Sequence, residues 1–177
     1  MAQETNRFLS TDTDVFISKN INFFTKSFMI MMCAYLESYI KDISMVIIDE
    51  MNIRLEKNQI PYNLIKWYLS KNKKLEGSEL KFEHLVIKIL KDELDISGNP
   101  FRTEALFKNF GIKLQGNIEF ETRKDRIQTL VSKRNNIIHH NDNASDLSVT
   151  DIIENILYIK SYILAIDNIV VKHISIP

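Results

Sequence analysis

Hydrophobic residues recur at helical spacing along most of the chain, and residues 22–56 form the first long stretch of this kind. The positions expected on one apolar face of that helix are Phe28, Met32, Tyr35, Leu36, Tyr39, Ile43 and Val46. Further apolar side chains fall on its other faces, namely Met29, Ile30, Met31 and Cys33. Apolar residues on several sides are typical of a central helix, or of one that also contacts a second copy of the chain.

The same periodicity predicts four further helices before the end of the chain. Their expected ranges are 62–69, 80–94, 101–110 and 121–139. In the helix over 80–94 the inward positions are Phe82, Leu85, Val86, Ile89 and Leu90. Ser148 and Asp151 then form a capping arrangement that opens the last helix, which extends to about His173. Strand alternation is convincing nowhere, and residues 111–120 are the only weak candidate.

Glycine and proline are scarce, at four and three of 177 residues, which favours helices joined by short connections. The first ten to eighteen residues are polar and are expected to form a loose arm. The predicted fold is therefore all-α, a bundle of four to five main helices with short extra helices. We expect one domain over residues 1–177, because the chain is about one domain long.

Charge and composition narrow the function classes. The 23 basic residues balance 23 acidic ones, which argues against a non-specific polyanion-binding protein more than against a nuclease. A single cysteine gives no disulfide framework or zinc knuckle. The first ten residues lack the features of a signal peptide, and the apolar run at 28–36 is too short to cross a bilayer. We expect a cytoplasmic protein that does not bind membranes.

The most informative residue is Arg134, because it interrupts an apolar stripe. At about 100° per residue, the stripe of the helix over 121–139 comprises Ile127, Leu130, Val131, Ile137 and Ile138. A guanidinium in such surroundings costs several kcal/mol, on the order of the penalty for a buried charge, unless a partner or a substrate anion compensates it. Arg134 therefore indicates either an internal ion pair or a site that binds a substrate anion.

Asn135 and His139 lie four residues apart on one edge of the same helix, next to Arg134. The three side chains combine a cation, an amide and a titratable imidazole. Cleavage of RNA by its own 2′-hydroxyl needs a base for that hydroxyl and a cation for the phosphate. Arginine suits the second role because its planar donors match phosphate oxygens.

Two other interpretations of this segment stay open at this point. Arg134 could pair internally with a carboxylate while His139 only caps the helix end, which is the common structural role of such residues. His139, His140 and Asp142 could bind a metal, but adjacent histidines point about 100° apart on a helix. Zinc sites also need three or four convergent ligands, and no fourth ligand is evident in the sequence. We therefore predict no metal and no cofactor.

The segment Arg134-Asn135-Asn136-Ile137-Ile138-His139 resembles the R-x4-H motif of the HEPN superfamily, in which a polar residue follows the arginine. A second segment, from Cys33 to Asp42, resembles the start of the core in a bacterial subgroup of HEPN-like nucleases that includes the RiboL-PSP type. The resemblance covers most of the chain in helix order, but only these two short segments are specific.

This resemblance implies a metal-independent endoribonuclease that acts as a toxin or effector in bacterial defence or toxin–antitoxin systems, or an inactive relative that serves as a dimerisation or binding module. It also implies a homodimer whose two motif helices form a composite site for an RNA substrate, with a cognate antitoxin or neighbouring defence protein as a further partner. Arg134 and His139 map onto the motif and Asn135 onto its polar position.

Two supporting residues are expected near this site. Glu37 is the residue of the first long helix that we expect close to Arg134, with a surface pair to Lys41 as the alternative. His140 occupies a position where the family often has a small residue, so its role stays open.

Overall fold

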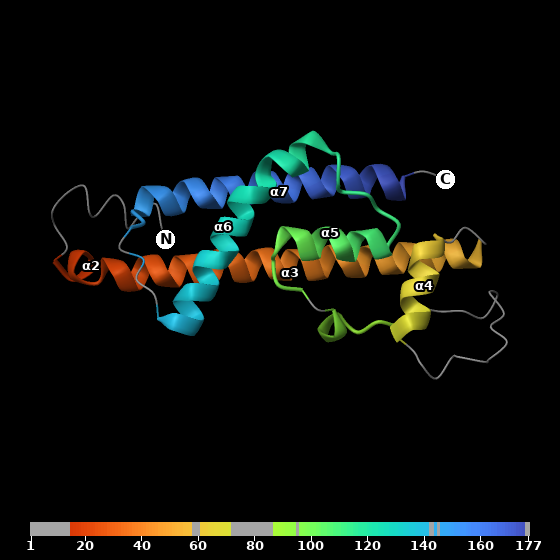
Figure 1. Ribbon diagram of the computed structural model, residues 1–177, viewed down its shortest axis with the longest axis horizontal. Helices are drawn as coiled ribbons and strands as arrows, with labels where there is room; N and C mark the ends of the chain where they lie inside the picture. Colours follow the sequence, from red (N-terminus) through yellow and green to blue (C-terminus); the bar gives the residue numbers. More distant parts are fainter. Residues whose placement is uncertain are drawn as a thin grey trace.

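The computed structural model describes residues 15–57, 61–71, 87–94, 96–141, 144 and 146–175. Regular structure in these residues is entirely helical (Figure 1). The helices in chain order are α2 (Val15–Lys19), α3 (Ile21–Glu56), α4 (Tyr62–Lys71), the 3-10 helix η3 (Lys91–Glu93), α5 (Pro100–Asn109), α6 (Ile118–His140) and α7 (Val149–Ile174). The all-α prediction is confirmed, and the long helices begin and end close to the expected residues.

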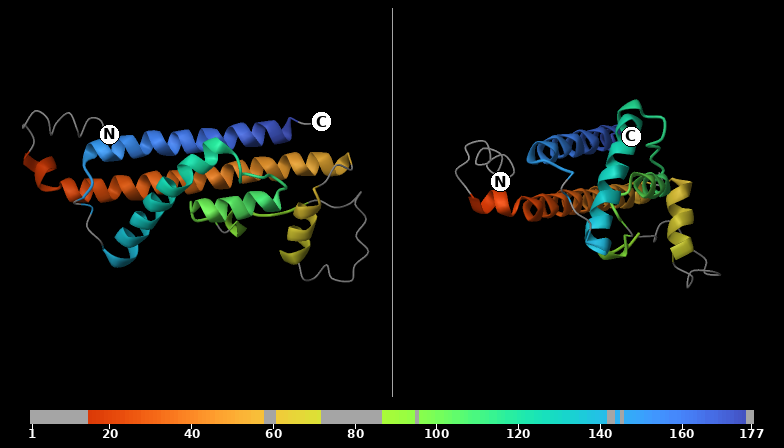
Figure 2. Two further views of the ribbon diagram at one scale, coloured as in Figure 1. Left: turned by 45° about the horizontal axis from the view of Figure 1, so that its top comes forward. Right: turned by 60° about the vertical axis from the view of Figure 1, so that its left-hand side comes forward.

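Two long parallel helices, α3 and α7, lie side by side, and α6 crosses them (Figure 1). The views in Figure 2 show α6 on one side of this α3–α7 layer. Helix α3 packs against both α6 and α7, and α6 also packs against α7. One core therefore fills the space between the three helices. Its most deeply buried members include Met29, Ile40, Ile47, Phe120, Tyr162 and Ile166.

The buried stripe of α3 differs from the predicted one. Met29 and Cys33, which were expected on other faces, are buried against α6 and α7, whereas Tyr35 and Val46 are 69% and 50% exposed. The prediction placed Tyr35 and Val46 on the covered face because residues up to 60° away fit a broad helical stripe equally well. Only the position of α6 decides which edge of that stripe is covered.

Local capping explains where the later helices begin. The Asn99 side chain accepts hydrogen bonds from the backbone of Phe101 and Arg102 at the start of α5. The Asn117 side chain caps α6 in the same way. The predicted capping arrangement of Ser148 with Asp151 is confirmed, because each side chain bonds the other residue's backbone N–H.

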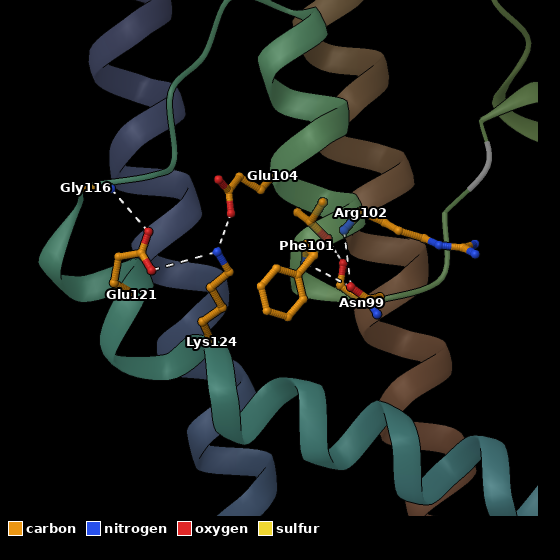
Figure 3. Close-up of polar contacts among 8 residues, drawn as sticks. Asn99, Phe101, Arg102, Glu104, Gly116, Glu121 and Lys124 are labelled. Atoms are coloured by element: carbon orange, nitrogen blue, oxygen red, sulfur yellow. Dashed lines mark hydrogen bonds and ion pairs between the residues drawn. The ribbon is translucent and has the colours of Figure 1, made fainter.

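A polar cluster joins α5 to α6 (Figure 3). The Lys124 ammonium group pairs with Glu104 of α5 and lies 4.4 Å from the centre of the Phe101 ring. Glu121 approaches the same ammonium group at 3.9 Å and accepts a hydrogen bond from the backbone N–H of Gly116. These contacts fix the start of α5, and with it the 96–99 turn, against α6.

The prediction of a helix over 80–94 is wrong for the part of this range that the structure describes. Residues 87–90 are not helical, and only Lys91–Glu93 form a short 3-10 turn. The Asn52 side chain exchanges hydrogen bonds with the backbone N–H and C=O of Ile87, so a tertiary contact replaces helical bonds there. Leu90, expected inward, is exposed. Residues 80–86 lie outside the described residues.

Two smaller expectations also need correction. The polar arm was predicted to reach as far as residue 18, but helix α2 already begins at Val15. Ile138, expected in the apolar stripe of α6, is 47% exposed, whereas the neighbouring Ile137 is buried. Residues 111–117 form turns and irregular structure, and no strand occurs among the described residues.

Candidate active site

Arg134 projects from α6 towards α3 and forms an ion pair with Glu37. The guanidinium Nη2 donates to Glu37 Oε1 at 2.5 Å. The side chains of Arg134 and Glu37 are only 17% and 21% exposed, so water screens the pair weakly. The expectation that Glu37 lies near Arg134 is confirmed, and the ion pair of Glu37 in the described structure is with Arg134 and not with Lys41.

Asn135 completes the polar contacts of this guanidinium. Its side-chain oxygen Oδ1 accepts a hydrogen bond from Arg134 Nη1 at 2.8 Å. Because Glu37 and Asn135 bond different nitrogens, they fix both the position and the plane of the guanidinium. Asn135 and His139 share one edge of α6, but the hydrogen-bond partner of the Asn135 side chain in the structure is Arg134.

The buried thiol of Cys33 lies close enough to this ion pair for the charges of Arg134 and Glu37 to affect it. The thiol of Cys33, on α3, donates to the backbone C=O of Leu130 at 3.9 Å and is buried. Burial raises the pKa of Cys33 to about 11, and the Arg134 charge opposes this shift only in part. A thiol with this pKa is neutral at physiological pH and is a poor nucleophile.

Gly98, in the turn before α5, lies next to the Glu37 side chain. A Cβ atom at Gly98 would lie 3.3 Å from Glu37 Cγ and 3.5 Å from Val131 Cγ2. The backbone of Gly98 has φ of +67°, which also favours glycine. A Cβ atom at this position would therefore force Glu37 to shift by a few tenths of an ångström. The sequence showed this segment only as a Gly-Asn-Pro turn, without any sign that it contacts the site.

His139 and His140 occupy the last turn of α6 and are both exposed. The hydrogen bonds and ion pairs that the described residues make with Arg134 go to Glu37 and Asn135, and none goes to His139. On an ideal helix the directions of Arg134 and His139 differ by about 140°. The structure thus brings Arg134, Asn135 and Glu37 together and leaves the two imidazoles at the helix end.

Lys26, which no local sequence pattern singles out, anchors this helix end. Lys26 Nζ on α3 donates to the Asn141 side-chain oxygen at 3.0 Å and to its backbone C=O at 3.3 Å. Asn141 has φ of +50°, a conformation in which asparagine commonly ends helices. Lys26 therefore holds the helix turn that carries His139 and His140. Its position two residues before the apolar run at 28–36 gives no signal of this contact.

Lys133, which precedes Arg134 on α6, forms a further ion pair. Lys133 Nζ lies 2.8 Å from Asp146 Oδ1, and this hydrogen bond lowers the pKa of the Asp146 carboxyl group.

Among the described residues, no group of three or more His, Cys, Asp or Glu side chains is placed to hold a metal ion. Asp142, considered above as a ligand beside His139 and His140, lies outside the described residues.

Comparison with protein families identifies the class to which this fold and motif belong. The family model RiboL-PSP-HEPN matches residues 3–172, which is almost the whole chain. The chain therefore belongs to the RiboL-PSP-HEPN family, as its R-x4-H segment indicated. It has no significant match among curated proteins or among solved structures. In the described part of the chain, no helix has the length and apolarity needed to span a bilayer.

Proposed function

We propose that this protein is a metal-independent endoribonuclease with Arg134, Asn135 and His139 as its active-site residues. The observation that carries the proposal is the arrangement of Arg134, which Glu37 and Asn135 hold in a fixed position within a HEPN-type motif. HEPN domains are often RNases. A fixed, partly exposed guanidinium needs no rearrangement to meet a phosphate group, which is the usual basis of electrostatic catalysis.

The proposed reaction is attack of a ribose 2′-hydroxyl on the adjacent phosphorus. His139 takes the proton of that hydroxyl, the 2′-oxygen forms a bond to phosphorus, and the bond to the 5′-oxygen breaks. The leaving 5′-oxygen takes up a proton from an imidazolium or from water. Arg134 neutralises the charge that develops on the phosphoryl oxygens. The products carry 2′,3′-cyclic phosphate and 5′-hydroxyl ends.

A second copy of the chain would complete this site. Within one chain Arg134 points towards α3 while His139 is exposed at the end of α6, so the two groups do not converge. If the ends of two α6 helices meet, the imidazole of one copy can approach the guanidinium of the other. This homodimer with a composite site is part of the proposal, as is a role as toxin or effector with an antitoxin or defence protein as partner.

One observation favours a different function, a binding module without catalysis. The Glu37 carboxylate already neutralises Arg134, which is the arrangement that a purely structural arginine needs. Expression in bacteria separates the two functions. Growth arrest that disappears in His139→Ala supports the nuclease, whereas harmless expression of the wild type supports the module.

The direct test of the nuclease is an RNA-cleavage assay in EDTA with mapping of the product ends. The wild type is expected to produce 2′,3′-cyclic phosphate ends, and His139→Ala is expected to produce none. His140→Ala shows whether the neighbouring imidazole contributes. Cleavage that requires an added metal would contradict the proposed chemistry.

A further inference from the structure

The α3–α7 layer has an exposed apolar face on the side away from α6. Tyr35 of α3 belongs to this face, whereas Glu37, which contacts Arg134, lies two positions further on. Two positions on a helix are about 200° apart, so the two side chains leave α3 on opposite sides. The face is therefore separate from the proposed active site, and Figure 2 shows that α6 covers only the other side of the layer.

A groove between α3 and α7 forms part of this face. It has a volume of about 380 Å³, and apolar side chains line it almost completely. Met31 and Tyr35 form its α3 edge, while Ile156 and Ile163 form its α7 edge. Lys160 is the charged residue among its lining residues. Contiguous exposed apolar surfaces rimmed by polar residues commonly mark interaction sites.

Exposed apolar side chains continue the face along both helices. On α7 they recur every seven residues, at Leu157, Leu164 and Val171, so they form one stripe next to the groove. On α3 they are Met31, Tyr35, Val46 and Ile53. The exposed fractions of these seven side chains range from 43% to 69%. A repeat of seven residues is the spacing with which one helix packs along another.

We propose that this face binds the same face of a second copy of the chain. Seven large side chains with these exposed fractions present on the order of 100 Å² each, or roughly 700 Å² together. A stable interface buries about 800 Å² on each partner, so the face has the area that a dimer needs. It is also long and lies on two helices, which suits packing of one layer on another.

The charges on the face are compatible with such self-association. Asp49 follows Tyr35 by two intervals of seven residues on α3 and is exposed, whereas the exposed Lys160 lies on α7. A second copy whose α3 lies against this α7 therefore brings opposite charges together. Because it lies on the far side of α3, this contact leaves the end of α6 free, and it does not depend on RNA cleavage.

The mass of the protein in solution tests this inference. Sedimentation equilibrium of the full chain is expected to give a dimer through this face, or a tetramer if the ends of α6 also pair. Leu164→Glu and Tyr35→Glu are each expected to halve the mass and to weaken self-association by about 100-fold, since a charge would lie in an apolar interface. Both side chains are exposed in the single chain, so circular dichroism and Tm should not change.

Ile118→Glu is the matched control, because Ile118 is the most exposed large apolar residue in the described structure and lies at the start of α6. Its mass should equal that of the wild type. A monomeric wild type at tens of micromolar, or a mass that survives both substitutions on the face, would overturn the inference. A wild type that self-associates through this face but does not cleave RNA would count against the proposed function alone.

Discussion

Arg134 Nη2 donates to Glu37 Oε1 at 2.5 Å, although the two residues are 97 positions apart in the sequence. This contact joins α6 to α3 where the R-x4-H segment begins. It also explains how an arginine can interrupt the apolar stripe of α6 without a large cost in stability. The carboxylate compensates the guanidinium charge, and Asn135 satisfies a further donor.

Glu37→Gln is expected to lower the free energy of unfolding by about 2 kcal/mol, because it leaves the Arg134 charge partly buried without a counterion. Urea unfolding at neutral pH measures this change. Asp42→Asn is the control on the same helix, since the pair of Asp42 with Lys91 is exposed and should contribute less than about 1 kcal/mol. Equal losses in the free energy of unfolding would show that the Arg134–Glu37 pair stabilises the fold no more than the exposed Asp42–Lys91 pair does.

Gly98→Ala tests the closure of the site by the 96–99 turn. The new methyl group would meet Glu37 and Val131 and would also strain a backbone with positive φ, so we expect a loss of about 2–3 kcal/mol. Gly116→Ala carries only the backbone strain, about 1–2 kcal/mol, because nothing lies within 4 Å of its Cβ position. The difference between the two thermal or urea unfolding curves therefore measures the packing of the turn on Glu37.

Cys33 gives the folded protein a dependence on alkaline pH. Below pH 9 the thiol is protonated in both states. Between its ordinary pKa of 9.0 and the folded value of about 11, the unfolded chain releases the proton while the folded chain keeps it. Stability therefore falls as pH rises through this interval, by about 2 kcal/mol for this group.

Comparison of wild type with Cys33→Ala isolates this effect. Burial also raises the pKa of Tyr39 and Tyr162, but both proteins retain these tyrosines. The unfolding free energy of Cys33→Ala should therefore decline less steeply between pH 9 and pH 11. Parallel declines in urea unfolding experiments would contradict the burial of this thiol.

Local sequence patterns were sufficient to predict most helices of this fold. Long apolar repeats and the Ser148–Asp151 cap placed α3, α6 and α7 to within a few residues. The prediction failed where a distant residue determines the conformation. Asn52 holds Ile87 in non-helical structure, and no local pattern near Ile87 reveals that contact.

The candidate site was predictable in part for the same reason. Arg134, Asn135 and His139 stand out because they lie on one helix, and Glu37 was expected from the resemblance to a family. The role of Gly98 depends on the packing of the 96–99 turn against α3, and the role of Lys26 on the approach of α3 to the end of α6. These contacts join segments far apart in the sequence, so spacing along the chain contains no information about them.

Cleavage of RNA by purified variants tests the central claim most directly. Wild type, Arg134→Ala and His139→Ala are incubated with RNA in EDTA, together with Lys113→Ala, which removes an exposed cation before the start of α6. Each substitution at Arg134 or His139 should lower the rate at least about 100-fold with the fold intact, while Lys113→Ala cleaves like the wild type and leaves 2′,3′-cyclic phosphate ends. Cleavage that persists in both Arg134→Ala and His139→Ala would contradict the assignment of this site.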